Sequence, residues 1–233
     1  MKMKETWITL LLFISVNLIS IAQNKFQEID NLIASESMID AKTALEKLET
    51  TLKKENNTSE YWLRISKANY NIFKIEEAEK ALNKAIELDR KNPVIHYEKG
   101  RFFNKIDKNE LAKESFSQAI LLKPESYYYF WRGISNQNLG LINDAEKDYK
   151  IAFEKGENTP EIHFNYALIL HQNGDFEKSL KHNNKAIELN PEYANAYKFR
   201  AMTHLMLFDL DAACVDSEKA FSMGINKFVN IPA

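Results

Sequence analysis

The sequence repeats itself with a period of about 34 residues, and this period restricts the fold more than any other feature. Small residues recur at that spacing in three columns that keep one register. The columns are Ser66, Gly100, Gly133, Ala167 and Ala201, then Ala78, Ala112, Ala145, Ser179 and Ala213, then Ala85, Ala119, Ala152, Ala186 and Ala220. Such agreement over five repeats indicates a chain assembled from copies of one structural unit.

Each repeat is predicted to be a pair of helices joined by a short turn. The chain has only 6 Gly and 5 Pro in 233 residues, and its stretches rich in Ala, Leu, Lys and Glu favour helices over strands. Turn sequences such as NGDF at 173–176 separate the first small column from the second. Small residues let the two helices approach closely. Because a single pair cannot bury its apolar face, neighbouring pairs are expected to stack.

This pattern resembles the tetratricopeptide repeat family. Repeat 93–125 carries that family's small and bulky residues in order, at Gly100, Phe103, Ala112, Phe116, Ala119 and Pro124. The resemblance implies an all-α fold, a right-handed superhelical solenoid of antiparallel helix pairs, with a concave groove lined by the first helix of each pair. It also implies a protein that binds its ligands in this groove.

We predict about six repeats between residues 23 and 224. They are 25–58, 59–92, 93–125, 126–159, 160–193 and 194–224, and a C-terminal tail of residues 225–233 follows. The first repeat is degenerate, because Leu32 stands where the later repeats have Ser, Gly or Ala. Its two helices are therefore expected to pack less closely.

The first 22 residues are predicted to be a secretory signal peptide. Lys2 and Lys4 precede an apolar run from Ile8 to Ala22, and the run ends in small residues. We expect cleavage before Gln23 and a periplasmic or secreted protein. The alternative is an uncleaved N-terminal membrane tether, which the length of the run disfavours: about 15 residues, against the roughly 20 that span a bilayer.

The sequence carries no recognisable catalytic or metal-binding motif. Its five histidines form no HExxH arrangement, and CxxC, Gly-rich phosphate-loop and GxSxG sequences are absent. Cys214 is the one cysteine, so the chain forms no internal disulfide. A formal net charge of −2 argues against nucleic-acid binding. We therefore predict no catalytic activity, no cofactor, no metal and no small-molecule substrate.

The resemblance places ligand contacts on the first helices, and the side chains expected there change in character along the chain. Toward the N-terminus most are basic, and the set is Arg64, Lys67, Tyr97, Arg101 and Lys105. Toward the C-terminus they are aromatic or apolar, and the set is Tyr127, Phe130, Trp131, Ile134, Phe164, Leu168, Phe199 and Met202. We expect a peptide or protein ligand with an acidic part toward one end and an apolar or aromatic anchor toward the other.

Three of these residues come from the aromatic stretch SYYYFWRG at 126–133. Tyr129 is predicted to pack inside its helix pair, and Tyr128 is predicted to lie toward the adjoining repeat. This assignment leaves Tyr127, Phe130 and Trp131 for the groove.

A different function would use the ends of the array. Repeat arrays usually finish with a polar capping helix, but only INKFVNIPA follows Gly224. The tail is expected either to fold back over the last repeat or to leave an apolar end exposed. The second case predicts a structural assembly subunit, with a homodimer contact through the C-terminal end.

Overall fold

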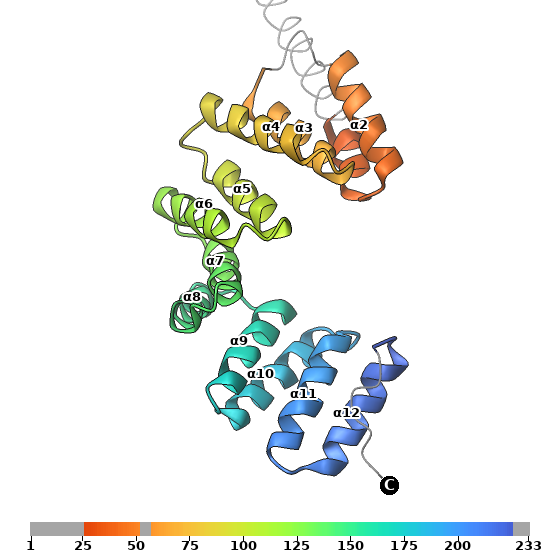
Figure 1. The fold of residues 1–233 in the computed structure, drawn as a ribbon, viewed down its shortest axis with the longest axis vertical. Coiled ribbons are helices and arrows are strands. Elements are labelled where there is room, and N and C mark those ends of the chain that lie inside the picture. Colours follow the sequence, from red (N-terminus) through yellow and green to blue (C-terminus); the bar gives the residue numbers. More distant parts are fainter. Residues whose placement is uncertain (1–25, 52–56, 226–233) are drawn as a thin grey trace, which may run out of the picture. The chain divides into compact units, whose positions relative to one another are not determined.

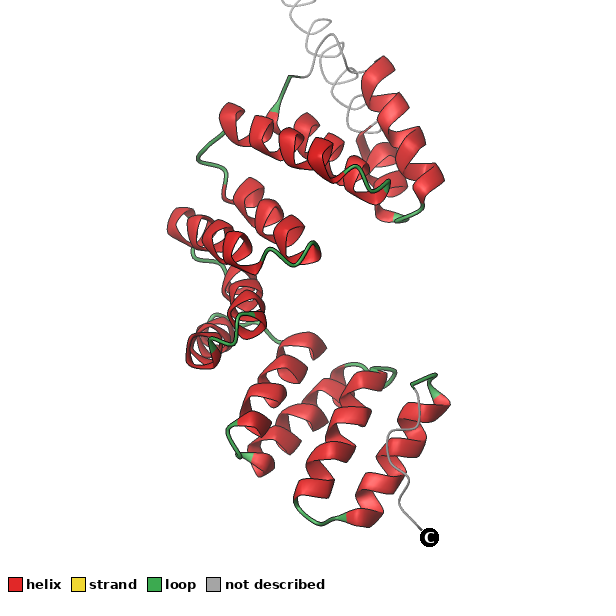
Figure 2. Cartoon of the chain, in the orientation of Figure 1, coloured by secondary structure: helices red, strands yellow, loops and turns green. Residues whose placement is uncertain are grey.

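The computed structural model describes residues 26–51 and 57–225 of the chain. Every regular element in these ranges is an α-helix, and the ranges contain no β-strand (Figure 2). The predicted all-α fold of consecutive helix pairs is therefore confirmed. The predicted signal sequence and residues 226–233 of the tail lie outside the described ranges. Among the described helices, none is long and apolar enough to cross a membrane.

The chain forms two compact bodies, residues 1–95 and residues 96–233. The N-terminal body contains a helical stretch at 26–34 and the helices α2 (Met38–Thr51), α3 (Ser59–Asn71) and α4 (Ile75–Leu88) (Figure 1). Helix α3 packs on both α2 and α4. Their buried cluster is made of aliphatic residues and one tyrosine, namely Ile29, Ile33, Ala44, Leu48, Tyr61, Ile65, Ala68 and Ala81.

The C-terminal body extends from α5 (Pro93–Lys105), whose first turn contains the boundary, to α12. The helices between and including these ends are α6 (Asn109–Leu122), α7 (Ser126–Asn138), α8 (Ile142–Glu154), α9 (Pro160–Gln172), α10 (Phe176–Leu189), α11 (Ala194–Met206) and α12 (Leu210–Ser222). From α6 onward each helix packs against the next, and α9 also contacts α11. The first helices α9 and α11 of successive pairs are thus neighbours.

Close helix packing in two repeats depends on a glycine that faces an aromatic ring. A Cβ atom at Gly100 would lie 2.6 Å from Cε1 of Phe116, and one at Gly133 would lie 2.5 Å from Cε1 of Tyr149. Both rings are fully buried. The Tyr149 hydroxyl also donates a hydrogen bond to Oε1 of Gln137 at 2.7 Å, which holds its ring in place. The aromatic ring on the second helix therefore requires glycine on the first.

The last two repeats have other residues at the positions of the glycine and the aromatic ring. These residues are Ala167 and Asn183 in repeat 160–193, and Ala201 and Ser217 in repeat 194–224. All four residues are buried. In the described part of the chain, neither Nδ2 nor Oδ1 of Asn183 has a hydrogen-bond partner. The bulky residue that the family resemblance implies on the second helix is thus replaced by a small polar one in these repeats.

The turns inside the helix pairs share a backbone conformation that the sequence reveals only in part. In the five repeats from residue 59 onward, one residue of the turn has a φ between 57° and 81°, and these residues are Phe73, Asp107, Gly140, Gly174 and Phe208. In each case the next N–H donates back to the first helix, as from Leu141 to the carbonyl of Asn136 at 2.8 Å. This arrangement is a Schellman cap. Glycine adopts it without strain, whereas the exposed Phe73 and Phe208 adopt it at a steric cost.

We expect Gly133→Ala to lower the free energy of unfolding by about 1 to 3 kcal/mol, because its Cβ would collide with the buried Tyr149 ring. Adding Tyr149→Leu is expected to recover part of the loss, since repeat 59–92 combines Ser66 with Leu82 at these positions. Urea unfolding of the single and double variants measures both effects. An unchanged urea midpoint for Gly133→Ala would show that the contact between residue 133 and the Tyr149 ring does not limit how closely the two helices pack.

Candidate functional site

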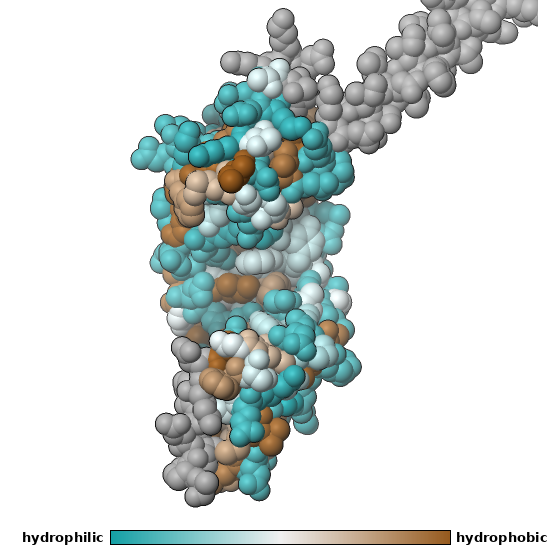
Figure 3. Space-filling view, turned by 90° about the vertical axis from the view of Figure 1, so that its right-hand side faces the viewer, coloured by the Kyte–Doolittle hydropathy of each residue, from teal (hydrophilic) through white to brown (hydrophobic). Residues whose placement is uncertain are grey.

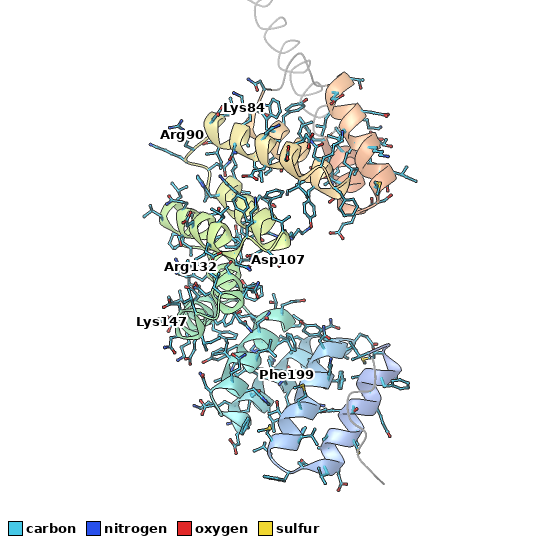
Figure 4. The ribbon with its side chains drawn as sticks, viewed as in Figure 1. Lys84, Arg90, Asp107, Arg132, Lys147 and Phe199 are labelled. Atoms are coloured by element: carbon cyan, nitrogen blue, oxygen red, sulfur yellow. The ribbon has the colours of Figure 1, made fainter. Side chains whose placement is uncertain are left out.

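Most of the predicted groove residues lie on α5, α7, α9 and α11, the first helices of the C-terminal body. Nine of them are partly buried and partly accessible, namely Tyr97, Arg101, Tyr127, Trp131, Ile134, Phe164, Leu168, Phe199 and Met202. We call these nine residues the first-helix face. Figure 4 shows Phe199, one of the nine, on α11. Lys105 at the end of α5 is exposed and engages another residue.

Phe130 does not belong to the first-helix face, and its predicted place in the groove is wrong. Its side chain is only 6% exposed, and its ring centroid lies 6.1 Å from that of Tyr149. Phe130 precedes Gly133 by three residues, so it shares the side of α7 that packs on α8. Tyr128 is buried and its ring lies 5.3 Å from that of Tyr97 on α5, which confirms that it points toward the adjoining repeat.

Arg101 on α5 is held between two aromatic rings of the face. Its Cζ lies 5.8 Å from the ring centroid of Tyr97 and 5.1 Å from that of Trp131 on α7. Trp131 also stacks on the buried Phe116 and packs against the cluster around Phe130. Burial raises the pKa of Tyr97 to about 12, so its phenol stays neutral near pH 7. The guanidinium group therefore lies against two uncharged rings.

A second group of rings connects α9 with α11. The ring of Phe164 lies 6.0 Å from that of Phe199 and 5.3 Å from that of Tyr193. His171 lies 5.0 Å from Phe199, and its Nδ1 is 3.1 Å from Oγ1 of Thr203. These contacts place an aromatic surface across two successive first helices, with part of each ring still accessible.

The basic residues predicted for the N-terminal end of the groove are less available than expected. In the N-terminal body, Arg64 binds both carboxylate oxygens of Asp30, at 2.8 Å from Nε and 2.9 Å from a terminal nitrogen. Its Cζ also lies 4.4 Å from the ring centroid of Phe26. Lys67 is half-buried and engages another residue. The charge of Arg64 is therefore already balanced, a pairing that the 34-residue spacing from Asp30 could have indicated.

Two ion pairs with buried carboxylates connect the helices within a pair, and sequence analysis missed both. Arg132 on α7, which is labelled in Figure 4, binds both carboxylate oxygens of Asp148 on α8, at 2.9 and 2.6 Å. Arg200 and Asp216, 68 residues further on, make the same bidentate contact at 2.7 and 2.6 Å. A spacing of 16 residues from Arg to Asp, repeated two repeats later, was the signal for both ion pairs in the sequence.

Tyr129 packs against the adjacent buried cluster, as predicted.

The repeat between these ion pairs has a histidine pair instead. Nδ1 of His163 lies 3.0 Å from Nδ1 of His182, and Nε2 of His163 lies 2.8 Å from Oδ1 of Asn158. Because the Asn158 oxygen accepts, His163 carries its proton on Nε2, and its Nδ1 accepts from His182. Burial, reinforced by His182, lowers the pKa of His163 to about 4, and burial also lowers the pKa of His182. Both rings are therefore neutral near pH 7.

Neither this pair nor any other cluster in the described ranges brings together three His, Cys, Asp or Glu side chains able to hold a metal ion. The histidines contact rings instead, since Phe153 lies 5.0 Å from His163 and Tyr166 lies 4.8 Å from His182. The pair is part of the packing between α8, α9 and α10.

Three segments of the chain match models of a known repeat family. One tetratricopeptide repeat model matches residues 59–92 and 94–126, and a second matches residues 160–193. The chain contains tetratricopeptide repeats. Its division into six such repeats stays a prediction, and so does the groove that would run through both bodies. A search of curated proteins by sequence found no match.

Several solved structures share this fold. YrrB, described as a protein with an unusual peptide-binding site, has a TM-score of 0.60 at 19% identity, over 76% of this chain and 91% of YrrB. PilF of Pseudomonas aeruginosa has a TM-score of 0.71 at 14% identity, over 86% and 93%. PilW, a type IV pilus biogenesis factor, has a TM-score of 0.65 at 18% identity, over 71% and 77%. At these identities the likeness concerns the fold alone.

The histidine pair predicts a loss of stability in acid. A folded-state pKa of about 4 for His163, below the usual 6.5, means that the unfolded chain binds more protons between these values. Stability is therefore complete above pH 6.5 and falls as the pH drops toward 4. We expect wild type to lose about 1 kcal/mol more than His163→Phe between pH 7 and pH 5, a figure reduced for solvent screening. Equal losses in urea unfolding would contradict this assignment.

Proposed function

We propose that the protein is a non-catalytic scaffold that binds a peptide or protein segment on the first-helix face. The observation that supports it is a row of accessible aromatic and apolar side chains on four consecutive first helices. Tetratricopeptide repeat proteins generally mediate protein–protein interactions, and this row lies on the helices that line the groove in that family. The surface view in Figure 3 shows hydrophobic residues in separate patches among hydrophilic ones.

The physical state of these side chains suits them to binding. Trp131 and Ile134 pack on the buried cluster beneath them, and Phe164 is held between Tyr193 and Phe199. Side chains that are already fixed lose little conformational freedom when a ligand arrives. Large aromatic residues in such places often contribute most of the binding free energy. Trp131 and Phe164 are therefore the proposed anchors of the interaction.

Export through a cleaved signal sequence is also part of this proposal. It is supported by Lys2 and Lys4 ahead of the apolar run that ends at Ala22. The ligand would then be a periplasmic or extracellular protein. N-terminal sequencing of the protein from its own cells tests the proposal, and a chain that still begins at Met1 would contradict it.

We expect Trp131→Ala and Phe164→Ala each to weaken partner binding by about tenfold or more, because each removes an anchor. The measurement is quantitative pull-down from the source cells, followed by titration with the captured partner. Leu121→Ala is the matched control, since Leu121 is 77% exposed on the second helix α6. Equal capture by wild type and both variants, with unchanged thermal unfolding, would contradict binding on this face.

A second candidate function is assembly through the C-terminal end, and it is supported by the surface of α12. On α8, Ile142 and Phe153 pack against the buried cluster that includes Ile162. The corresponding residues of α12, Leu210 and Phe221, are 52% and 57% exposed. No further helix pair covers them in the described part of the chain. We propose a homodimer contact as the occupant of this surface in the assembly model.

For this assembly model, we expect light scattering to show a dimer for wild type and a monomer for Phe221→Glu, because a buried charge disrupts an apolar contact. Leu121→Glu places the same charge on an exposed residue of α6 and is expected to remain dimeric. A wild-type monomer across the accessible concentration range would rule out the dimer.

A further inference from the structure

Helices α8, α9 and α10 meet around two histidine rings. Phe153 near the end of α8 lies 5.0 Å from the ring of His163 on α9 and 5.5 Å from the ring of His182 on α10. We call these three residues the histidine joint. Of the two proposed anchors, Trp131 belongs to α7, before the joint, and Phe164 belongs to α9, after it. The histidine joint therefore lies between the two anchors along the chain.

The contact between the two imidazole rings has room for one hydrogen only. Their Nδ1 atoms are 3.0 Å apart, and a hydrogen bond of this length needs one nitrogen to donate and the other to accept. Nε2 of His163 donates to Oδ1 of Asn158 at 2.8 Å, which leaves His182 as the donor between the rings. With a hydrogen on both Nδ1 atoms, two donors would face each other, and the contact would be lost.

The histidine pair can take up one proton and keep this contact, whereas a second proton breaks it. The first proton binds Nε2 of His182, which has no hydrogen-bond partner among the described residues, and Nδ1 of the same ring still donates. The second proton has to bind Nδ1 of His163, opposite the N–H of His182. That step removes the hydrogen bond and places two positive rings side by side. The second proton is therefore the one that changes the structure.

The carboxylates around the histidine joint already have basic partners. Burial lowers the pKa of His163, the nearby His182 and Lys185 lower it further, and Glu188 raises it. Lys185 and Glu188 pair with each other at 2.6 Å. On α8, Glu146 accepts from the hydroxyl of Tyr166 at 3.5 Å and pairs with Lys150 at 2.8 Å. Acid thus adds positive charge to the joint beside carboxylates that are already neutralised.

We propose that the histidine joint is a pH-sensitive switch that releases the bound segment in acid. Uptake of the second proton forces the rings of His163 and His182 apart and loosens their packing on Phe153 of α8. The spacing between Trp131 and Phe164 then changes, and a segment that contacts both anchors loses one of them. This inference rests on the proposed binding function and adds its regulation.

The adjoining repeats hold their helices together in a way that a histidine pair does not. At the positions of Tyr166 and His182 they have ion pairs between arginine and aspartate. These pairs are Arg132 with Asp148 and Arg200 with Asp216. Opposite charges join the helices there, whereas neutral rings join α9 to α10. Protonated histidines therefore add repulsion inside repeat 160–193 and not inside its two neighbours.

The direction of the effect follows from the proton affinity of the closed joint. The pKa of His163 is about 4 while the joint is closed, below the usual 6.5 that a solvated ring would have after opening. An open joint thus binds the second proton more tightly, and opening becomes easier as the pH falls below 6.5. Between pH 7 and pH 4.5 the ratio of open to closed joint rises by at most roughly 60-fold for one such ring.

Distances between spin labels test the opening of the joint without any ligand. In a Cys214→Ser background, labels at Lys147→Cys on α8 and Lys181→Cys on α10 lie on opposite sides of the joint, and both residues are exposed. Pulsed EPR is expected to show a longer or broader distance at pH 4.5 than at pH 7. The control pair, Lys181→Cys with Lys219→Cys on α12, lies on one side of the joint and is expected to keep its distance.

Two variants remove the trigger. His182→Gln puts an amide beside His163, and an amide can accept from a protonated ring as well as donate to a neutral one. His163→Phe removes the second proton site and decides the question if His182→Gln does not fold. Both variants are expected to show the same label distance at pH 7 and pH 4.5. His204→Gln changes a histidine of α11 outside the joint and is expected to keep the shift.

Peptide affinity tests the link to binding. The probe is a 12-residue peptide that wild type enriches from a random phage library at pH 7, chosen without Asp, Glu or His so that the peptide itself does not titrate. Binding is expected to be about tenfold weaker at pH 4.5 than at pH 7 for wild type and for His204→Gln, and less than about twofold weaker for His182→Gln and His163→Phe.

The outcomes separate the switch from the function on which it rests. If the label distance across the joint does not change, or if both trigger variants shift as wild type does, the switch is wrong and peptide binding stands. If the control pair changes as well, acid unfolds the body as a whole, and the switch is again wrong. A shift without loss of peptide affinity overturns release in acid. If wild type enriches no peptide at pH 7, binding on the first-helix face is wrong, whatever the labels show.

Discussion

In two repeats, the contact between a glycine on the first helix and an aromatic ring on the second sets the position of the other side chains. In the pair α7 and α8, the Tyr149 ring occupies the space that a Cβ of Gly133 would take. This contact fixes which side of α7 is buried. Phe130 lies on that side and is enclosed, whereas Trp131 is one position further around the helix and stays partly accessible. The face offered to a ligand therefore follows from the packing of the helix pair.

The period of the sequence was sufficient to predict the fold, because small residues at three fixed positions leave few alternatives to stacked helix pairs. Side-chain exposure was harder to predict, since it was assigned by column as though each repeat were identical. Phe130 and Phe164 occupy the same column, yet Phe130 packs on Tyr149, while the repeat of Phe164 has Asn183 at the position of Tyr149. Without an aromatic partner on the second helix, Phe164 contacts α11 instead. The exposure of a side chain in this column thus depends on the residue that follows it by 19 positions, on the second helix of the same repeat.

Polar contacts were also difficult to predict from the sequence, for a different reason. A charged residue looks the same in a sequence whether it is paired or free. Arg64 was counted as a basic groove residue, but Asp30 of the degenerate first repeat neutralises it. The pairs of Arg132 with Asp148 and of Arg200 with Asp216 follow a regular spacing of 16 residues, which the groove positions alone do not reveal. Their regularity supports a structural role. In the intervening repeat the same two positions hold Tyr166 and His182, whose rings pack against each other.

These internal pairs explain why net charge says little about what such a repeat protein binds. The formal net charge of −2 suggests no particular partner, and three of the four first-helix arginines are bound to carboxylates of the same chain. Ligand preference then depends on the few charged groups that remain unpaired where the packing leaves space beside them.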